Sequence, residues 1–210
     1  MQSLKYDLKL FLHDTVRVDL EAFIPLFHRW IQDQRLQELL IDVADYRHVH
    51  HGPGVVLIAH DAHYAMDMAQ GRLGLLYSRR RETHPSRQAL QSVTDRLRSV
   101  FHCALTACQE LETDPALQGR LRFRGDELLL RLNDRLRAPN TAAAYHALRQ
   151  HLEPFLTTLY PDQHVEVEQI SAPTAGLTVV IKVAQNPDVA TLLARLEACQ
   201  QPIVLTGTRK

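Results

Sequence analysis

The feature that most constrains the fold is that the chain changes its hydrophobic period in the same order twice. At the start, apolar residues such as Leu8 and Leu10 alternate with polar ones, and from Phe23 onward they recur every three or four residues. A period of two is typical of a half-buried strand, and a period near 3.6 is typical of an amphipathic helix. Interpreted in this way, residues 4–125 and 127–206 both follow the order β-α-β-β-α-β.

The element boundaries follow from these periods together with turn and capping residues. An aspartate, Asp19, is placed to cap the first helix, and an Asn-Pro pair at 186–187 is placed to begin the last one. We expect strands at residues 4–12, 39–45, 55–59, 121–125, 128–134, 165–168, 177–183 and 202–206, a further hairpin across 62–78, and helices at 19–35, 86–111, 140–159 and 187–196.

The order β-α-β-β-α-β is that of the ferredoxin-like unit. We therefore predict an α+β protein made of two tandem ferredoxin-like units. The first unit covers residues 1–125 and contains the extra hairpin, and the second covers residues 126–210. A single continuous mixed sheet with its helices on one face remains open as the alternative, because it belongs to the same α+β class.

Composition restricts the classes of partner. The chain has 210 residues, 24 basic against 24 acidic ones, and no apolar run of the roughly 18 residues that a membrane span requires. Zero net charge removes the usual long-range attraction to nucleic acid. The three cysteines, Cys103, Cys108 and Cys199, are odd in number and irregularly spaced, which favours a reducing compartment. With no signal-peptide pattern at the start, we expect a cytoplasmic protein with no membrane association.

Nucleic-acid binding is also disfavoured by the predicted sheet of the second half. Its strands at 128–134, 165–170 and 177–183 contain no Phe, Tyr or Trp, whereas single-stranded RNA is bound by stacking bases on such side chains. Some RNA-processing endonucleases have tandem ferredoxin-like folds and use a histidine of the first helix, a position that His28 occupies. That alternative stays open, although the glycine-rich C-terminal loop of those enzymes has no counterpart here.

The densest group of metal-ligating residue types lies between residues 42 and 67. His48 and His50 are two apart, so both imidazoles would point the same way on an extended chain and could bind one metal ion. The turn at Gly52-Pro53-Gly54 could bring His60 and His63 back toward them. The sequence thus suggests a divalent transition-metal site formed by these four histidines, although no complete metal-binding motif is present. An ordinary polar loop is the competing interpretation.

A second candidate site is a run of arginines. Arg79, Arg80 and Arg81 are consecutive, and Arg72 precedes them. Arginine forks bind phosphate and carboxylate groups in a bidentate manner, so these residues could hold an anion or a nucleotide. Three adjacent arginines cannot all face one ligand, however, and a solvated loop that leads into the long helix is the alternative.

No complete catalytic motif is found, neither a nucleophile elbow nor a glycine-rich phosphate-binding loop. We therefore expect a non-catalytic binding or assembly module, with no catalytic residue assigned and no cofactor other than the metal considered above. Regular half-buried sheets of this kind commonly pair with each other, so a homodimer or another protein partner is expected. Trp30 and Tyr46 are the residues we expect at that interface.

Several stretches of the sequence resemble a family of uncharacterised bacterial cytosolic proteins. The resemblance rests on Asp19-Leu-Glu-Ala-Phe-Ile-Pro-Leu-Phe-His-Arg-Trp-Ile-Gln32, Leu40-Ile-Asp-Val-Ala-Asp-Tyr46, Gly52-Pro-Gly-Val-Val-Leu-Ile58, Gly71-Arg-Leu-Gly-Leu-Leu-Tyr77 and Leu132-Asn-Asp-Arg-Leu-Arg-Ala-Pro-Asn140. That family has no known activity. The resemblance therefore implies a bacterial cytosolic origin and assigns no site residues.

Overall fold

The computed structural model describes residues 5–13, 18–50, 52–80, 92–170 and 176–198. Over these ranges the chain is of the predicted α+β class, and its strands form one eight-stranded antiparallel sheet. The strands are β1 (Tyr6–Leu12), β2 (Leu40–Tyr46), β3 (Gly54–Ala59), β4 (Ala62–Asp67), β5 (Gly74–Arg79), β6 (Phe123–Leu132), β7 (Val165–Gln169) and β8 (Thr178–Val183). The α-helices are α1 (Phe23–Asp33), α3 (Val93–Thr113), α4 (Ala142–Leu159) and α5 (Val189–Ala198).

The strand order across the sheet is β2-β3-β4-β5-β1-β6-β8-β7. The two halves of the chain meet where β1 pairs with β6, with Tyr6 opposite Leu132 and Leu10 opposite Leu128. Two separate sheets were expected, one for each unit, but the structure has a single sheet that contains the strands of both halves. This is close to the alternative that the sequence left open, although the strand pairs are all antiparallel where a mixed sheet was considered.

The strands expected at 121–125 and 128–134 are one bent strand, β6. Its register against β1 jumps between Leu10, which faces Leu128, and Leu12, which faces Phe123. At Gly125 the backbone lies so close to Pro187 that a Cβ atom would be 2.0 Å from the Pro187 carbonyl oxygen. The glycine thus marks a bend where β6 contacts the chain before α5, and it does not end a strand. The boundary expected between residues 125 and 126 lies inside this strand.

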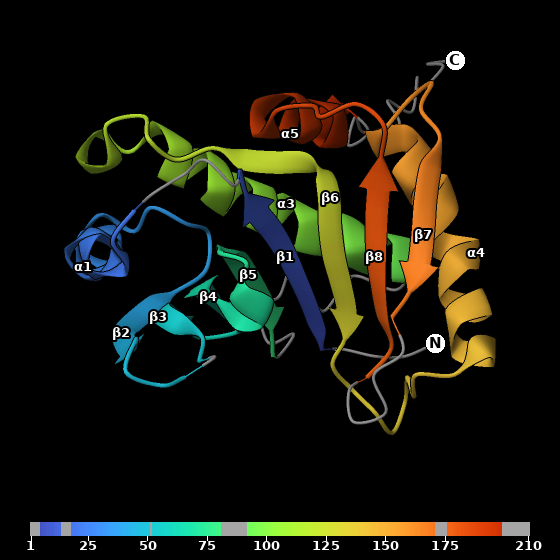
Figure 1. Ribbon diagram of the computed structural model, residues 1–210, viewed down its shortest axis with the longest axis horizontal. Coiled ribbons are helices and arrows are strands. Elements are labelled where there is room, and N and C mark those ends of the chain that lie inside the picture. Colours follow the sequence, from blue (N-terminus) through green and yellow to red (C-terminus); the bar gives the residue numbers. More distant parts are fainter. Residues whose placement is uncertain (1–4, 14–17, 51, 81–91, 171–175, 199–210) are drawn as a thin grey trace, which may run out of the picture.

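The helices pack against one face of the sheet, as Figure 1 shows. The first helix packs against β2 and β3, while α3 crosses behind β1 and β5 and contacts both α4 and α5. Strand residues of one parity, such as Leu8, Leu130 and Ile181, join the helices in one continuous apolar core. We call the sheet face toward the helices the helix face and the opposite one the open face.

Local signals account for several helix starts. Ser92 caps α3 by accepting a hydrogen bond from the Asp95 amide, and Asp19 caps the short 3-10 turn at Leu20–Ala22 that leads into α1. Pro25 lies in the first turn of α1, where a missing amide donor costs no intrahelical bond, so it does not interrupt the helix. The expected helical residues 86–91 and the expected last strand at 202–206 lie outside the described residues. In the part of the chain that is described, no helix combines the length and the apolar character needed to cross a bilayer.

Candidate functional site

The four candidate metal-binding histidines lie at opposite ends of β3. His48 and His50 are in the turn between β2 and β3, whereas His60 is in the turn between β3 and β4, and His63 is on β4. A strand of six residues separates the two pairs by about 20 Å, because each residue advances about 3.3 Å. In the described ranges no group of three His, Cys, Asp or Glu side chains could hold a metal. The structure therefore does not bring the predicted ligands into one metal site.

The two histidines near the β3–β4 turn have separate environments. The His60 ring lies 2.9 Å from the Asp61 carboxylate, measured from Nδ1 to Oδ1. The pKa of His63 is lowered by burial and, in addition, by the positive charge of Arg80. A histidine whose pKa is lowered in this way is suited to packing at the sheet.

The arginine run is divided between the two faces and the two ends of β5. Arg72 precedes the strand, and its guanidinium stacks on the Phe11 ring at 3.8 Å from the ring centroid. Arg79 ends the strand and is fully buried on the helix face, while Arg80 is exposed and Arg81 lies outside the described residues. The three described arginines, Arg72, Arg79 and Arg80, therefore do not converge on one anion site. The expectation that Arg79 belongs to a solvated loop is wrong, because its side chain is in the core.

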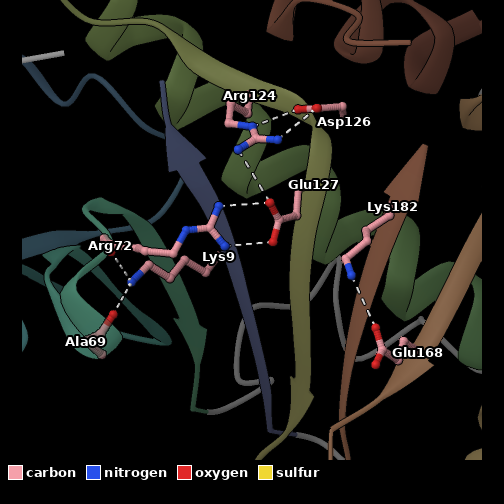
Figure 2. A network of polar contacts seen from close by, with 8 residues as sticks. All are labelled: Lys9, Ala69, Arg72, Arg124, Asp126, Glu127, Glu168 and Lys182. Carbon is pink, nitrogen blue, oxygen red and sulfur yellow. Dashed lines mark hydrogen bonds and ion pairs between the residues drawn. The ribbon is translucent and has the colours of Figure 1, made fainter. Parts of the chain in front are cut away.

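An ion-pair network crosses the open face (Figure 2). Lys9 of β1 binds the Asp67 carboxylate at 2.6 Å and donates to the carbonyl oxygens of Ala69 and Arg72. The Arg72 guanidinium binds Glu127 in a bidentate manner, with distances of 2.7 and 2.8 Å. Burial lowers the pKa of Lys9, and the neighbouring Asp67 carboxylate opposes that shift.

The same network continues along the bent part of β6. Arg124 pairs with Asp126 at 2.9 Å and with Glu127 at 3.5 Å, and a separate pair joins Lys182 to Glu168 across β8 and β7. Each of these cations thus has a carboxylate partner within the face, and Figure 2 shows the pairs of Arg72, Arg124 and Lys182. The network joins the end of β4 and the segment after it to β1 and β6, and the separate pair joins β8 to β7, so we assign these contacts a structural role.

A second polar cluster is buried on the helix face, between β4, β5 and α3. The hydroxyls of Tyr64 and Tyr77 donate to the two carboxylate oxygens of Glu38, at 2.5 and 3.1 Å. Arg79 donates from Nε to the Tyr77 hydroxyl and from Nη2 to Ser99. Burial, followed by the charges of Cys103 and Glu38, raises the pKa of Tyr64 well above its usual value, so this hydroxyl remains a donor at neutral pH. Sequence patterns gave no signal for this cluster, because Glu38 lies in an irregular segment.

The exposed apolar side chains are gathered on β2 and its flanks. Among the described residues, the large apolar side chains that are clearly exposed are those of Leu39, Ile41, Tyr46, Val49, Met68 and Leu136. Four of these lie within residues 39–49, and we call those four (Leu39, Ile41, Tyr46 and Val49) the β2 surface. Concentrated apolar exposure of this kind is typical of a protein-binding surface. Tyr46 was expected there, but Trp30 is buried and donates from Nε1 to Asp114 at 3.3 Å.

The two edges of the sheet differ from each other. The β7 edge carries the exposed glutamates Glu166 and Glu168, which discourage pairing with another strand. The β2 edge has a register irregularity between Leu40 and Asp42, and the Asp42 side chain accepts the hydrogen bond of the Val43 amide. A bulge and an occupied donor also discourage strand addition. The β2 surface is therefore suited to contacts through its side chains.

Comparison with models of known protein families, with curated proteins and with solved structures finds no match to this chain. The function must therefore be inferred from the residues and geometry described above.

Proposed function

We propose that this protein is a non-catalytic assembly module that forms a homodimer through its β2 surface. The observation that carries the proposal is the concentration of exposed apolar side chains there, with Leu39 and Ile41 exposed by 61% and 52%. Leaving such residues in water forgoes the stabilisation of about 25 cal/mol for each Å² of apolar surface that a partner would cover. The apolar stripes of the four described helices, in contrast, contribute to the protein's own core.

The charges beside the β2 surface favour a second copy of the chain as the partner. Asp42 is exposed near the start of β2, and Arg47 follows its end, where it pairs with Asp45 and Glu21. In a two-fold interface each copy presents the same patch to the other. An axis near the middle of β2 would run the two strands in opposite directions, so that Asp42 of one copy approaches the partner's Arg47. At both ends of the patch an aspartate of one copy would then approach an arginine of the other and share it with Asp45 and Glu21.

The test is to measure the molar mass of the full chain in solution by sedimentation or light scattering. We expect a dimer for the unsubstituted protein and a monomer for Ile41→Asp, because a carboxylate would be buried among apolar side chains. The matched control is Leu136→Asp, since Leu136 is 97% exposed and lies away from β2. This variant should remain dimeric. A protein that is monomeric at every soluble concentration would overturn the proposal.

Charge reversal tests the antiparallel arrangement itself. Asp42→Arg and Arg47→Asp should each weaken the dimer, because each brings like charges together across the interface. The double variant restores opposite charges and should recover dimerisation relative to either single variant. Equal and additive weakening would exclude the arrangement in which these two residues meet.

For the fold, we interpret the sheet as two ferredoxin-like units that share β6. This is supported by the sequence β6-α4-β7-β8-α5, whose strands lie in the lateral order β6-β8-β7. The first unit would then run from β1 to β6, with β4 and β5 as the inserted hairpin. We also propose a cytoplasmic location, which the thiols of Cys103 and Cys108 support, because neither forms a disulfide.

A further inference from the structure

The long helix α3 carries two cysteines whose surroundings differ. Cys103 lies beside a small hollow and is 6% exposed, whereas Cys108, one and a half turns further along, is completely buried. We propose that Cys103 is a reactive thiol that small peroxides oxidise to a sulfenic acid, and that Cys108 is inert. This inference is independent of the proposed dimer.

The hollow gives a small molecule access to the sulfur atom. It is bordered by Cys103, Glu38, Tyr64, His102 and Thr106, and its free volume is about 10 Å³. A space of this size holds about one water molecule. The hydroxyl oxygen of Thr106 is buried there without a hydrogen-bond partner in the protein, so it is available to a polar molecule that enters. The hollow is therefore large enough only for a very small polar reagent next to the sulfur.

A buried cation lies against the same sulfur. Arg79 is completely buried, and its Nη2 atom lies 3.8 Å from Cys103 Sγ and 2.9 Å from the Ser99 hydroxyl. The bond to Ser99 and the bond from Nε to the Tyr77 hydroxyl fix the guanidinium in position. A guanidinium beside a cysteine stabilises the thiolate, which is the nucleophilic form. The hollow and the Arg79 guanidinium thus both lie next to the sulfur atom of Cys103.

The proposed reaction is balanced with peroxide as the only oxidant. The Cys103 thiolate attacks one peroxide oxygen, an S–O bond forms, and the O–O bond breaks with its electron pair on the departing hydroxide. Hydroxide takes a proton from solvent and leaves as water. The sulfur is oxidised by two electrons and the peroxide is reduced by two, which leaves a sulfenic acid that an added thiol can reduce again.

Cys108 provides an internal comparison on the same helix. Its burial, together with the negative charge of Glu112, raises its pKa well above the usual thiol value. It therefore remains a protonated thiol in an apolar environment, where thiols are inert.

The test measures oxidation of each cysteine in the full chain with Cys199→Ser, because Cys199 lies outside the described residues. The folded protein is treated with hydrogen peroxide, sulfenic acid is trapped with dimedone, and the labelled peptides are quantified by mass spectrometry. We expect Cys103 to be labelled at least about tenfold faster than Cys108. In denaturant the two should be labelled at similar rates. Equal labelling of the two cysteines in the folded protein, or slower labelling of Cys103, would overturn the proposal.

Two variants test the role of the cation. Arg79→Gln should slow labelling of Cys103 by about tenfold, because the charge beside Sγ is lost, and leave the slow labelling of Cys108 unchanged. Tyr77→Phe removes only the hydroxyl that accepts from Arg79 Nε, so it loosens the guanidinium with a smaller change in the core. It should slow labelling by a smaller factor. If neither substitution changes the rate in a protein that remains folded, Arg79 does not activate the thiol.

Discussion

The two faces of the sheet each bury a cation, and they satisfy it in different ways. On the open face, Lys9 binds Asp67 directly and takes two backbone carbonyls as further acceptors. On the helix face, the Arg79 guanidinium donates to the hydroxyls of Tyr77 and Ser99, and the Tyr77 hydroxyl in turn donates to Glu38. An ammonium is a compact charge suited to a single ion pair, whereas a guanidinium spreads its charge over several donors.

This difference indicates what each cluster can do besides holding the fold. On the open face, Lys9 and Asp67 are both buried and face each other, so their two charges are paired. The cluster on the helix face borders a hollow and includes the sulfur of Cys103. We therefore assign reactivity to the helix face, where a guanidinium lies against a sulfur atom that borders a hollow.

Replacing the arginine should cause the largest loss of stability. Arg79→Met keeps an unbranched side chain in the core but leaves the hydroxyls of Tyr77 and Ser99 without the buried donor from which they accept. Removing one member of a buried charged cluster costs about 3 to 5 kcal/mol. The free energy of unfolding, measured by denaturant titration, should fall by that amount. A loss below about 1 kcal/mol, the range of an exposed pair, would show that the guanidinium contributes little to the core.

The open-face pair should show a different pattern of coupling. Lys9→Met alone should cost about 3 kcal/mol, because Asp67 stays buried without its cation. Lys9→Met combined with Asp67→Leu removes both charges and should recover most of that loss. Denaturant titration of both single variants and the double variant gives the coupling energy. Additive losses would contradict the direct pairing of the two residues.

A smaller, pH-dependent effect is expected at Asp7, which lies on the open face of β1. Burial raises its pKa above the usual 3.8, although hydrogen bonding to Ser78 and the charge of Arg131 oppose the shift. The folded state therefore binds the proton more tightly than the unfolded state, and stability falls as the pH rises from about 3.8 through the folded pKa.

The variant Asp7→Asn removes this titration. Its free energy of unfolding relative to the unsubstituted protein should increase over the same pH range and then level off. The increase amounts to about 1.4 kcal/mol for each unit by which the pKa is raised. The exposed Asp45→Asn provides the contrasting control, because hydrogen bonds from Arg47 lower the pKa of Asp45 to about 2. Its stability should instead decline relative to the unsubstituted protein as the pH rises above that value. A difference at Asp7 that does not vary with pH would show that this carboxyl is not perturbed.

Periodicity predicted most elements correctly because each pattern is local. The alternation in β1 places Leu8 and Leu10 in the core, and the stripe of α3 places Leu97, Phe101 and Cys108 there. The same pattern is incomplete for Lys9, because alternation places it on the face opposite Leu8 and does not show that it is buried with Asp67. Alternation gives the face of a residue but not what covers it, and the partners of Lys9 are about sixty residues further along the chain.

The candidate sites show the same limit. The spacing of His48 and His50 says nothing of His60, because the intervening residues form an extended strand that separates the pairs. The cluster around Glu38 joins residues from an irregular segment, two strands and a helix. No sequence pattern connects them, because their proximity arises only when β4 and β5 pair and α3 packs across them.

The sequence by itself determined the α+β class, the position of most strands and helices, and the side of each element that faces the core. These properties follow from interactions between residues a few positions apart. The tertiary structure alone decided that both halves share one sheet through β1 and β6, that Gly125 bends a strand, and that Arg79 is buried against Cys103. Those outcomes depend on contacts between residues far apart in the chain, and their free energy is gained only when the elements pack together.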